Sequence, residues 1–248
     1  MCALDRLVAR PIAHRGLHVL QDGLVENTSS AFEAAIAAGY GIECDLQITA
    51  DGEAVVHHDP VLGRLTDGSA RIAALTTAEL KQIAFKSSGD RMITLGELCD
   101  LVAGRAAMLI ELKSGFDGDQ RLVRRAAEVL VGYAGPAAVM SFDPGQVAAL
   151  RRCAPRLPRG IVAESQYRPV DWAQLPQGLR RSMTYFAHAL RTRPQFVAFA
   201  VKDLPAAIPW FARQMFRLPI LTWTVRSFEE WQRASHFADQ MIFEGFRP

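Results

Sequence analysis

The chain has 248 residues, half of them apolar, and its 28 basic and 26 acidic side chains leave a net charge of +2. A chain of this length and hydrophobicity can bury one large core, which excludes a disordered protein and is typical of a single α/β barrel or doubly wound domain. The near balance of charge excludes a surface adapted as a whole to nucleic acid or to a membrane. Any selectivity for a charged ligand must therefore be local.

The amino-terminal segment carries Asp5, Arg6 and Arg10 and has no uninterrupted hydrophobic stretch, so it does not resemble a secretion signal. No apolar run reaches the length of a membrane-spanning helix. The four cysteines show no CxxC spacing and are typical of reduced core thiols. We therefore expect a cytoplasmic protein with no nucleic-acid partner and no stable insertion in a membrane, and we leave a homo-oligomer open.

The first predicted strand begins at Pro11 and ends at the sequence HRG, residues 14–16. This places a titratable ring and a permanent cation at the carboxyl end of a strand, where catalytic groups often lie. Apolar residues then recur at helical spacing up to Gly39. Asn27 or Thr28 is the predicted N-cap of that helix.

The next strand begins at Gly41 and carries Glu43 and Asp45, whose carboxylates leave the same face because side chains alternate along a strand. Residues 51–52 predict a turn, after which the apolar run 54–56 returns the chain toward His58. Two close carboxylates raise each other's pKa unless a divalent cation keeps both ionised. This stretch therefore indicates one half of an oxygen-rich metal site, and the alternative is an exposed strand with a solvated acidic face.

Residues 60–95 are the predicted insertion over the site, with a capped helical turn at 75–80. A second capped helix is predicted over 94–102. A buried strand then ends in the sequence ELK, in which alternation sends Glu111 and Lys113 to one face. A third acidic ligand and a cation thus come together.

Eight predicted strands alternate with helices, and every strand but the last is followed by a helix. They begin at Pro11, Gly41, Met108, Ala137, Gly160, Phe196, Pro219 and Asp239. This pattern predicts a (β/α)8 TIM barrel, an α/β fold in a single domain over residues 1–248 with a short insertion after the second strand. Pro248 leaves no room for an eighth helix, so we expect the amino-terminal segment or a partner to cover the groove beside the last strand.

Polar side chains follow the carboxyl ends of these strands, the rim on which barrel enzymes carry their active sites. The candidates are His14, Glu43, Asp45, Glu111, Lys113, Glu164, Trp223 and Glu244. Position alone supports Glu164 and Glu244, and we interpret both as structural.

Five motifs lie along this rim in a fixed order. They are HRG at 14–16, ENT at 26–28, ECD at 43–45, HD at 58–59 and ELK at 111–113. Their order and spacing resemble the glycerophosphodiester phosphodiesterase family, and the resemblance covers nearly the whole chain. It implies a metal-dependent phosphodiesterase that hydrolyses glycerophosphodiesters to sn-glycerol 3-phosphate and an alcohol.

The resemblance also implies roles for the residues that contact substrate. His14 and His58 would be the acid and base of catalysis, in an order that the sequence leaves open. Arg15 and Lys113 would bind the phosphate, although Lys113 could instead only pair with its acidic neighbour. Trp223 would face the glycerol side of the substrate.

The acidic residues would hold the cofactor that the resemblance implies, one divalent ion, either Mg²⁺ or Ca²⁺. Glu43, Asp45 and Glu111 would be its ligands. Glu26 would be an additional ligand, or it would contact and orient the residues that bind the ion.

Two departures from the family affect substrate choice: Arg226 stands where Asn is frequent, and Glu244 replaces an Asp. One alternative is therefore a lysophospholipase D activity, which predicts an apolar groove in the insertion. The residues that could line such a groove are Leu62, Leu65, Ile72 and Phe85. The other alternative is a catalytically silent barrel that binds a phosphorylated ligand, but binding alone would not require both an acid and a base.

Overall fold

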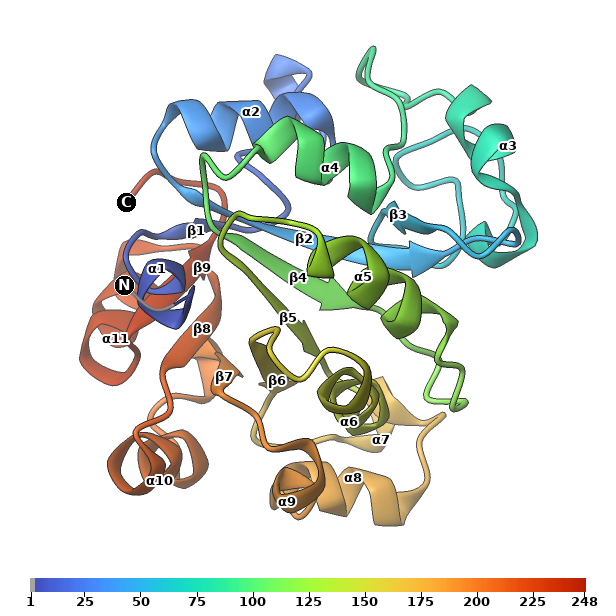
Figure 1. Cartoon of the computed structure of the whole chain (residues 1–248). Coiled ribbons are helices and arrows are strands. Elements are labelled where there is room, and N and C mark those ends of the chain that lie inside the picture. The colour runs from blue at the N-terminus through green and yellow to red at the C-terminus, as the bar shows by residue number, and fades with distance from the viewer. Residues whose placement is uncertain (1–2) are drawn as a thin grey trace.

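The computed structural model describes residues 3–248. Within them, eight parallel strands close into a barrel, in which each strand pairs with the next and β1 pairs with both β2 and β9 (Figure 1). The strands are β1 (Ile12–Ala13), β2 (Gly41–Ile48), β4 (Met108–Leu112), β5 (Ala137–Ser141), β6 (Arg159–Ala163), β7 (Phe196–Ala200), β8 (Ile220–Val225) and β9 (Gln240–Phe243). The predicted (β/α)8 barrel is confirmed.

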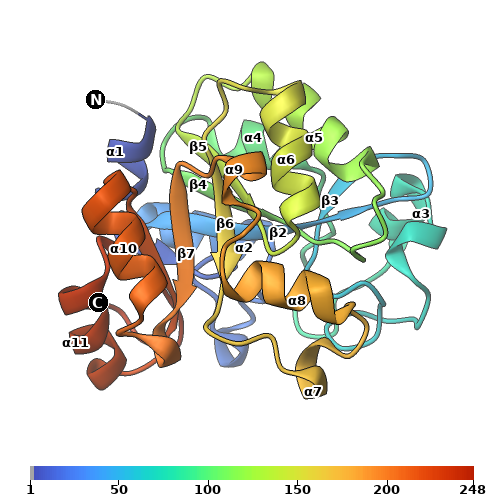
Figure 2. The same ribbon diagram turned by 90° about the horizontal axis from the view of Figure 1, so that it is seen from below.

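Helices cover the outside of the barrel (Figures 1 and 2). The longer ones are α2 (Ser29–Ala37), α4 (Leu95–Val102), α5 (Arg121–Val131), α6 (Pro144–Cys153), α8 (Gln177–Thr184), α10 (Ala207–Phe216) and α11 (Phe228–Phe237). The short helices α7 (Pro169–Trp172) and α9 (Ala189–Thr192) flank α8 in sequence. Helix α5 shows why they pack: its apolar residues fall on one stripe that is buried against the barrel.

Helix α1 (Ala3–Leu7) leads into a segment that contacts the last strand, where Gln240 Nε2 of β9 donates to the Val8 carbonyl at 3.0 Å. This contact agrees with one of our two expectations, that the amino-terminal segment covers the groove there. Helix α1 itself packs against the barrel interior. Its Leu7 packs among side chains that fill the barrel interior, including Ile12 and Phe196. Aromatic rings also pack on β9: the Phe243 ring centroid lies 4.9 Å from that of Tyr40 and 5.7 Å from that of Phe246. No helix follows β9 in the described chain.

The insertion after β2 has a small core of its own. It comprises β3 (Ala54–Val56), which pairs antiparallel with the end of β2, and the helix α3 (Thr77–Gln82). Leu62, Ile72 and Phe85 are only 5%, 1% and 4% exposed, and Leu62 and Ile72 pack in this core. The expected apolar groove is therefore not formed by these three buried side chains, and the fourth candidate, Leu65, is half-buried.

Two of the predicted helix caps are confirmed, and one is wrong. Thr76 and Thr94 each form a capping box at the start of α3 and α4. Thr28 occupies the N-cap position of α2, but its hydroxyl donates to the Val25 carbonyl at 2.8 Å. Asn27 does not cap the helix either, because its amide bonds to Asp45.

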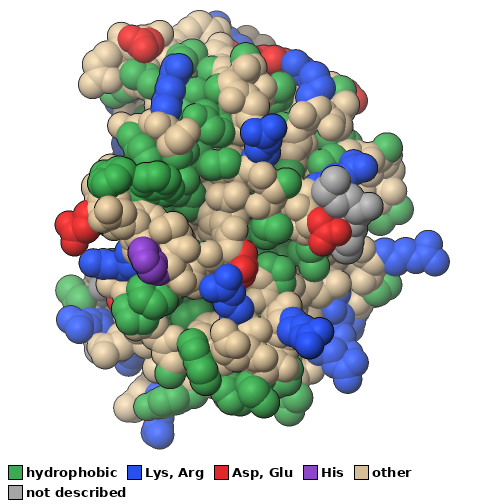
Figure 3. Space-filling view, turned by 90° about the vertical axis from the view of Figure 1, so that its left-hand side faces the viewer, with side chains coloured by type: hydrophobic (Ala, Val, Ile, Leu, Met, Phe, Trp, Pro, Cys, Tyr) green, Lys and Arg blue, Asp and Glu red, His purple; other side chains and the backbone are tan. Residues whose placement is uncertain are grey.

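Helices α10 and α11 lie on the opposite side of the barrel from the insertion (Figures 1 and 2). Their outer surface exposes large apolar side chains such as Trp210, Phe216 and Phe228. Figure 3 shows hydrophobic side chains together with Lys and Arg on this face of the molecule. None of the described helices combines the length and the apolar character needed to span a membrane.

Candidate active site

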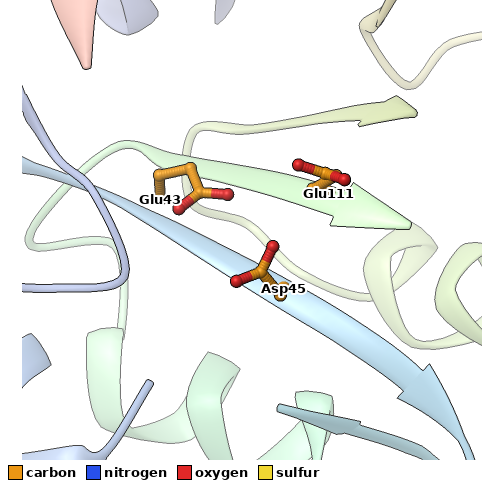
Figure 4. Close-up of side chains that lie close together, drawn as sticks. All are labelled: Glu43, Asp45 and Glu111. Atoms are coloured by element: carbon orange, nitrogen blue, oxygen red, sulfur yellow. The ribbon is translucent and has the colours of Figure 1, made fainter. Parts of the chain in front are cut away.

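Neighbouring strands bring three carboxylates together at the carboxyl-terminal rim. Asp45 of β2 lies in register with Glu111 of β4, and Glu43 precedes Asp45 by two positions on the same face. Each of the three offers an oxygen within 4.8 Å of the others (Figure 4). All three are buried, so the strand alternation placed them in the barrel rather than on a solvated face.

The donor set suits a hard divalent cation. Glu43 accepts the Arg15 backbone N–H with Oε2 at 3.0 Å, whereas its buried Oε1 has no hydrogen-bond partner in the described chain. Burial, together with the charges of Asp45 and Glu111, raises the pKa of Glu43 well above its ordinary value. A bound cation would both satisfy the orphan oxygen and keep this carboxyl ionised.

Two cations lie directly against these acids. Arg15 Nε is 3.2 Å from Asp45 Oδ2, and Lys113 Nζ lies 2.8 Å from Asp45 Oδ1 and 2.7 Å from Glu111 Oε1. Burial raises the pKa of the Asp45 carboxyl, but Lys113 and Arg15 outweigh it and hold that pKa below its ordinary value. Lys113 does pair with its acidic neighbour, and it also lies on the wall of the cavity.

The backbone of the HRG turn sets the direction of the first two site residues. Arg15 has φ 57° and Gly16 has φ 83°, both in the left-handed region. A Cβ on Gly16 would lie 2.9 Å from the Ala31 carbonyl carbon at the start of α2. Glycine is therefore required both for the conformation and for the close approach of the helix.

His14 is oriented by a carboxylate from the last strand end. Its Nδ1 bonds to Glu244 Oε2, and its Nε2 lies 4.0 Å from Glu43 Oε2. Because a carboxylate can only accept, Nδ1 carries the proton and Nε2 is left free toward the acidic cluster. Burial lowers the pKa of His14, and the bond to Glu244 opposes that shift. Glu244 also accepts from Arg226 Nε at 2.5 Å.

His58 has the same arrangement with a neighbour in sequence. Its Nδ1 lies 2.8 Å from Asp59 Oδ1, and Asp59 Oδ2 accepts from Arg64 Nε at 2.5 Å. The backbone carbonyl of His58 accepts from Gln47 Nε2 at 2.8 Å. Burial lowers the pKa of this ring as well. In both histidines Nδ1 is thus the nitrogen bound to a carboxylate, and Nε2 is left for other contacts.

Glu26 lies outside the three-carboxylate group. Its Oε1 accepts from Arg15 Nη1 at 2.8 Å and from Arg64 Nη2 at 2.7 Å. Glu26 therefore joins the arginine beside the acids to the arginine that holds Asp59. This geometry favours the supporting role over the role of a ligand, both of which we considered from the sequence.

A cavity of about 160 Å³ gathers the predicted residues. His14, Arg15, Glu43, His58, Glu111, Lys113 and Trp223 line it. Trp223 is held on its wall by donation from Nε1 to the Ala198 carbonyl at 3.0 Å and by an edge contact with Phe142. A second cavity of about 440 Å³ shares His58 and Lys113 with the first, so the two adjoin.

Two residues of the site have contacts that the sequence did not predict. Asn27, with φ 58°, donates from Nδ2 to Asp45 Oδ2 at 2.9 Å and accepts the Asp45 N–H with Oδ1 at 3.2 Å. Glu244, which we interpreted as structural, contacts His14. In the sequence, only the position of Glu244 at a strand end indicated that it could belong to the site. Glu164 accepts from Trp172 Nε1 at 2.6 Å, away from this cavity.

Comparison with known proteins agrees with the motifs. Residues 14–243 match the sequence profile described as the glycerophosphoryl diester phosphodiesterase family. A glycerophosphodiester phosphodiesterase of Caldanaerobacter subterraneus subsp. tengcongensis is 31% identical over 163 residues, which span 61% of this chain and 65% of that protein. A Mycobacterium tuberculosis protein named probable glycerophosphodiester phosphodiesterase 1 is 26% identical over 243 residues, which span 88% of this chain and 82% of that protein.

Solved structures share the fold. A phosphodiesterase of Oleispira antarctica, solved in complex with the product sn-glycerol-3-phosphate, has a TM-score of 0.79 at 19% identity and covers 98% of this chain and 95% of its own. A glycerophosphodiester phosphodiesterase of Thermotoga maritima has a TM-score of 0.69 at 22% identity, with 94% and 92% covered. Since the family profile spans nearly all of the residues described, the chain belongs to the glycerophosphoryl diester phosphodiesterase family.

Proposed function

We propose that the protein hydrolyses glycerophosphodiesters to sn-glycerol 3-phosphate and an alcohol, using one divalent ion, Mg²⁺ or Ca²⁺. The observation that carries this proposal is that two carboxylate-bound histidines share a small cavity with the cluster of Glu43, Asp45 and Glu111. A phosphodiester needs its oxygens neutralised, a nucleophile activated and its leaving alkoxide protonated. The cavity contains groups suited to each of these tasks.

Arg15 and Lys113 are the residues proposed to bind the phosphate. Arg15 can bind two oxygens with its planar guanidinium, and Lys113 acts as a point charge. Both are paired with carboxylates in the structure, so neither adds uncompensated charge before substrate arrives. A divalent ion held by Glu43, Asp45 and Glu111 would supply Lewis-acid polarisation of a phosphoryl oxygen.

The cavities suggest how the histidines divide their work. His14 lines only the smaller cavity, with Trp223, whereas His58 lies where the two adjoin. We place the glycerol beside His14 and Trp223 and the departing alcohol beside His58. His14 Nε2 then removes the proton of the glycerol 2-hydroxyl, which attacks phosphorus, while protonated His58 gives its Nε2 proton to the leaving alkoxide. Water opens the cyclic phosphate in a second step, and the two proton transfers are reversed.

The two rival functions gain no support from the site. A lysophospholipase D activity needs room for an acyl chain, whereas Leu62, Ile72 and Phe85, three of the four side chains that could line such a groove, are buried. A silent binding barrel has no use for two histidines that each present a free nitrogen to one cavity. The cytoplasmic location, the single domain and a homo-oligomer remain predictions from the sequence.

A coupled assay for glycerol 3-phosphate tests the proposal. Glycerophosphocholine, glycerophosphoethanolamine and a lysophospholipid are each incubated with Mg²⁺, Ca²⁺ or chelator. Metal-dependent release from the first two is expected, and it should be abolished by His14→Ala, whose metal binding is measured separately by calorimetry. Cleavage of the lysophospholipid alone, or wild-type turnover by His14→Ala, would show the proposal to be wrong.

A further inference from the structure

We infer that the larger cavity beside His58 binds the leaving alcohol and selects small alcohols that carry N–H or O–H donors. This inference rests on the proposed function and deepens it. The cavity has a volume of about 440 Å³ and lies against the carboxyl ends of β2 and β4. His58 and Lys113 separate it from the smaller cavity. An alcohol attached to a phosphate held at Lys113 can therefore extend into it past His58.

Polar and apolar groups both line this cavity, and nine of its described lining residues are polar or charged. The insertion contributes Arg71, whose guanidinium makes no hydrogen bond or ion pair with a described residue. The segment between β4 and α5 contributes Ser114, Asp117 and Asp119. No aromatic side chain is among the described residues that line it. A quaternary ammonium group is usually recognised by aromatic rings, and the described lining has none. An acyl chain needs a continuous apolar surface, whereas charged side chains interrupt the apolar part of these walls.

One buried hydrogen-bond acceptor is available on the wall of the cavity. Gln146 in the first turn of α6 is only 3% exposed and donates from Nε2 to the Asp119 carbonyl at 2.6 Å. That bond fixes the orientation of the amide, and Oε1 is left without a partner among the residues described. A buried acceptor without a partner is unfavourable, and a donor on a bound alcohol would relieve it.

An exposed carboxylate also lines the cavity. Asp117 is exposed, and its Oδ1 accepts the Asp119 N–H at 2.9 Å. Its Oδ2 accepts no hydrogen bond from a described residue, so it can receive one from a ligand. Gln146 suits any O–H or N–H donor, whereas Asp117 adds attraction for an ammonium group. The shared chemistry is therefore that of a polyol or of a primary amino alcohol.

Three substrates that differ only in the leaving alcohol test the inference: glycerophosphoethanolamine, glycerophosphoglycerol and glycerophosphocholine. For the wild-type protein, kcat/KM should be about tenfold higher for the first two, the factor expected for one hydrogen bond that choline cannot make. In Gln146→Met, the ratio of kcat/KM for the first two substrates to kcat/KM for glycerophosphocholine should be close to one. Gln195→Met removes a bonded amide outside the cavity and should leave the preference unchanged.

A second variant keeps the test valid if Gln146→Met does not fold. Asp117→Asn should lower kcat/KM for glycerophosphoethanolamine about threefold relative to glycerophosphoglycerol, because an exposed charge contributes modestly. Asp100→Asn, exposed on α4 outside this cavity, is the matched control. If Asp117→Asn lowers kcat/KM for glycerophosphoethanolamine alone, the selected alcohol is an amino alcohol. If the wild-type protein has equal kcat/KM for glycerophosphoethanolamine and glycerophosphoglycerol, the cavity selects any alcohol with a hydrogen-bond donor.

The inference is overturned if the wild-type protein prefers the choline compound, or if Gln146→Met lowers all three rates equally. In both cases the proposed hydrolysis stands, because the substrates are still cleaved. If none of the three is cleaved by the wild-type protein with either metal, the proposed function fails first, and the inference fails with it.

Discussion

The carboxylate of Glu244 holds the imidazole of His14 although the two residues are 230 positions apart in the sequence. Closure of the barrel brings them together, because β1 pairs directly with β9. Arg226 binds the other oxygen of Glu244 and so fixes the carboxylate in turn. Burial raises the pKa of Glu244, but its bonds to His14, His18 and Arg226 outweigh that effect and lower it, so the carboxylate stays ionised beside the ring.

Glu244→Gln should therefore lower kcat more than it lowers substrate affinity. The amide can turn its nitrogen toward His14 and favour the tautomer with the proton on Nε2, which cannot act as a base. Loss of a partner behind a functional histidine typically costs about 10–100-fold in activity. Steady-state kinetics on a hydrolysed glycerophosphodiester measure kcat and KM separately.

Glu229→Gln provides the control for this variant, since Glu229 is an exposed glutamate on α11 that pairs only with Arg233 among the described residues. Glu244→Asp should recover part of kcat, because it keeps a carboxylate on a shorter side chain. Unchanged kcat in Glu244→Gln would mean that the contact with His14 has no part in turnover.

Metal binding should stabilise the folded protein as well as activate it. A ligand at about 100 times its Kd contributes about 2.7 kcal/mol to the free energy of unfolding if it binds only the native state. Thermal unfolding with Mg²⁺, Ca²⁺ or chelator measures this shift. Glu43→Gln should remove most of it, because it replaces the carboxylate whose Oε1 has no protein partner. A shift that survives in Glu43→Gln would place the ion elsewhere.

Gly16→Ala should destabilise the protein by about 2 kcal/mol or more and lower activity with it. The alanine must adopt a left-handed φ, and its Cβ lies 2.9 Å from backbone and side-chain atoms of Ala31. Gly52→Ala separates these two effects, because Gly52 has φ 82° with nothing within 4 Å of its Cβ position. Urea unfolding should show the smaller loss for Gly52→Ala. Equal losses would mean that the contact with α2 adds nothing.

Much of the rim could be predicted from the sequence because its information is local. Alternation along a strand is enough to send Glu43 and Asp45, or Glu111 and Lys113, to one face. Parallel strands that begin at one end of a barrel bring their carboxyl ends to one rim. Those two rules account for the gathering of the acids, His14 and Lys113. His58 is placed by the antiparallel return of β3 along β2, which the turn at residues 51–52 indicated.

The partners of these side chains could not be predicted in the same way. The sequence around Asn27 fits a helix cap, yet its amide binds Asp45 once β2 lies beside it, because a buried carboxylate needs donors. The contact of Glu244 with His14 exists only in the closed barrel. The apolar residues of the insertion looked available for a ligand, but Ile72 is buried because a segment of that size needs its own core.

Acid should destabilise the fold through His188, which is remote from the site. Burial, with a smaller effect of Arg191, lowers the pKa of His188 from 6.5 to about 4. The unfolded chain therefore binds a proton below about pH 6.5 that the folded chain resists, so stability is full above that pH and falls as pH decreases toward 4. Because the ring is buried, the loss between pH 7.5 and 4.5 should be about 2 kcal/mol. Urea unfolding at both pH values should show a smaller change in His188→Gln than in wild type, whereas an equal change would assign the acid sensitivity to other groups.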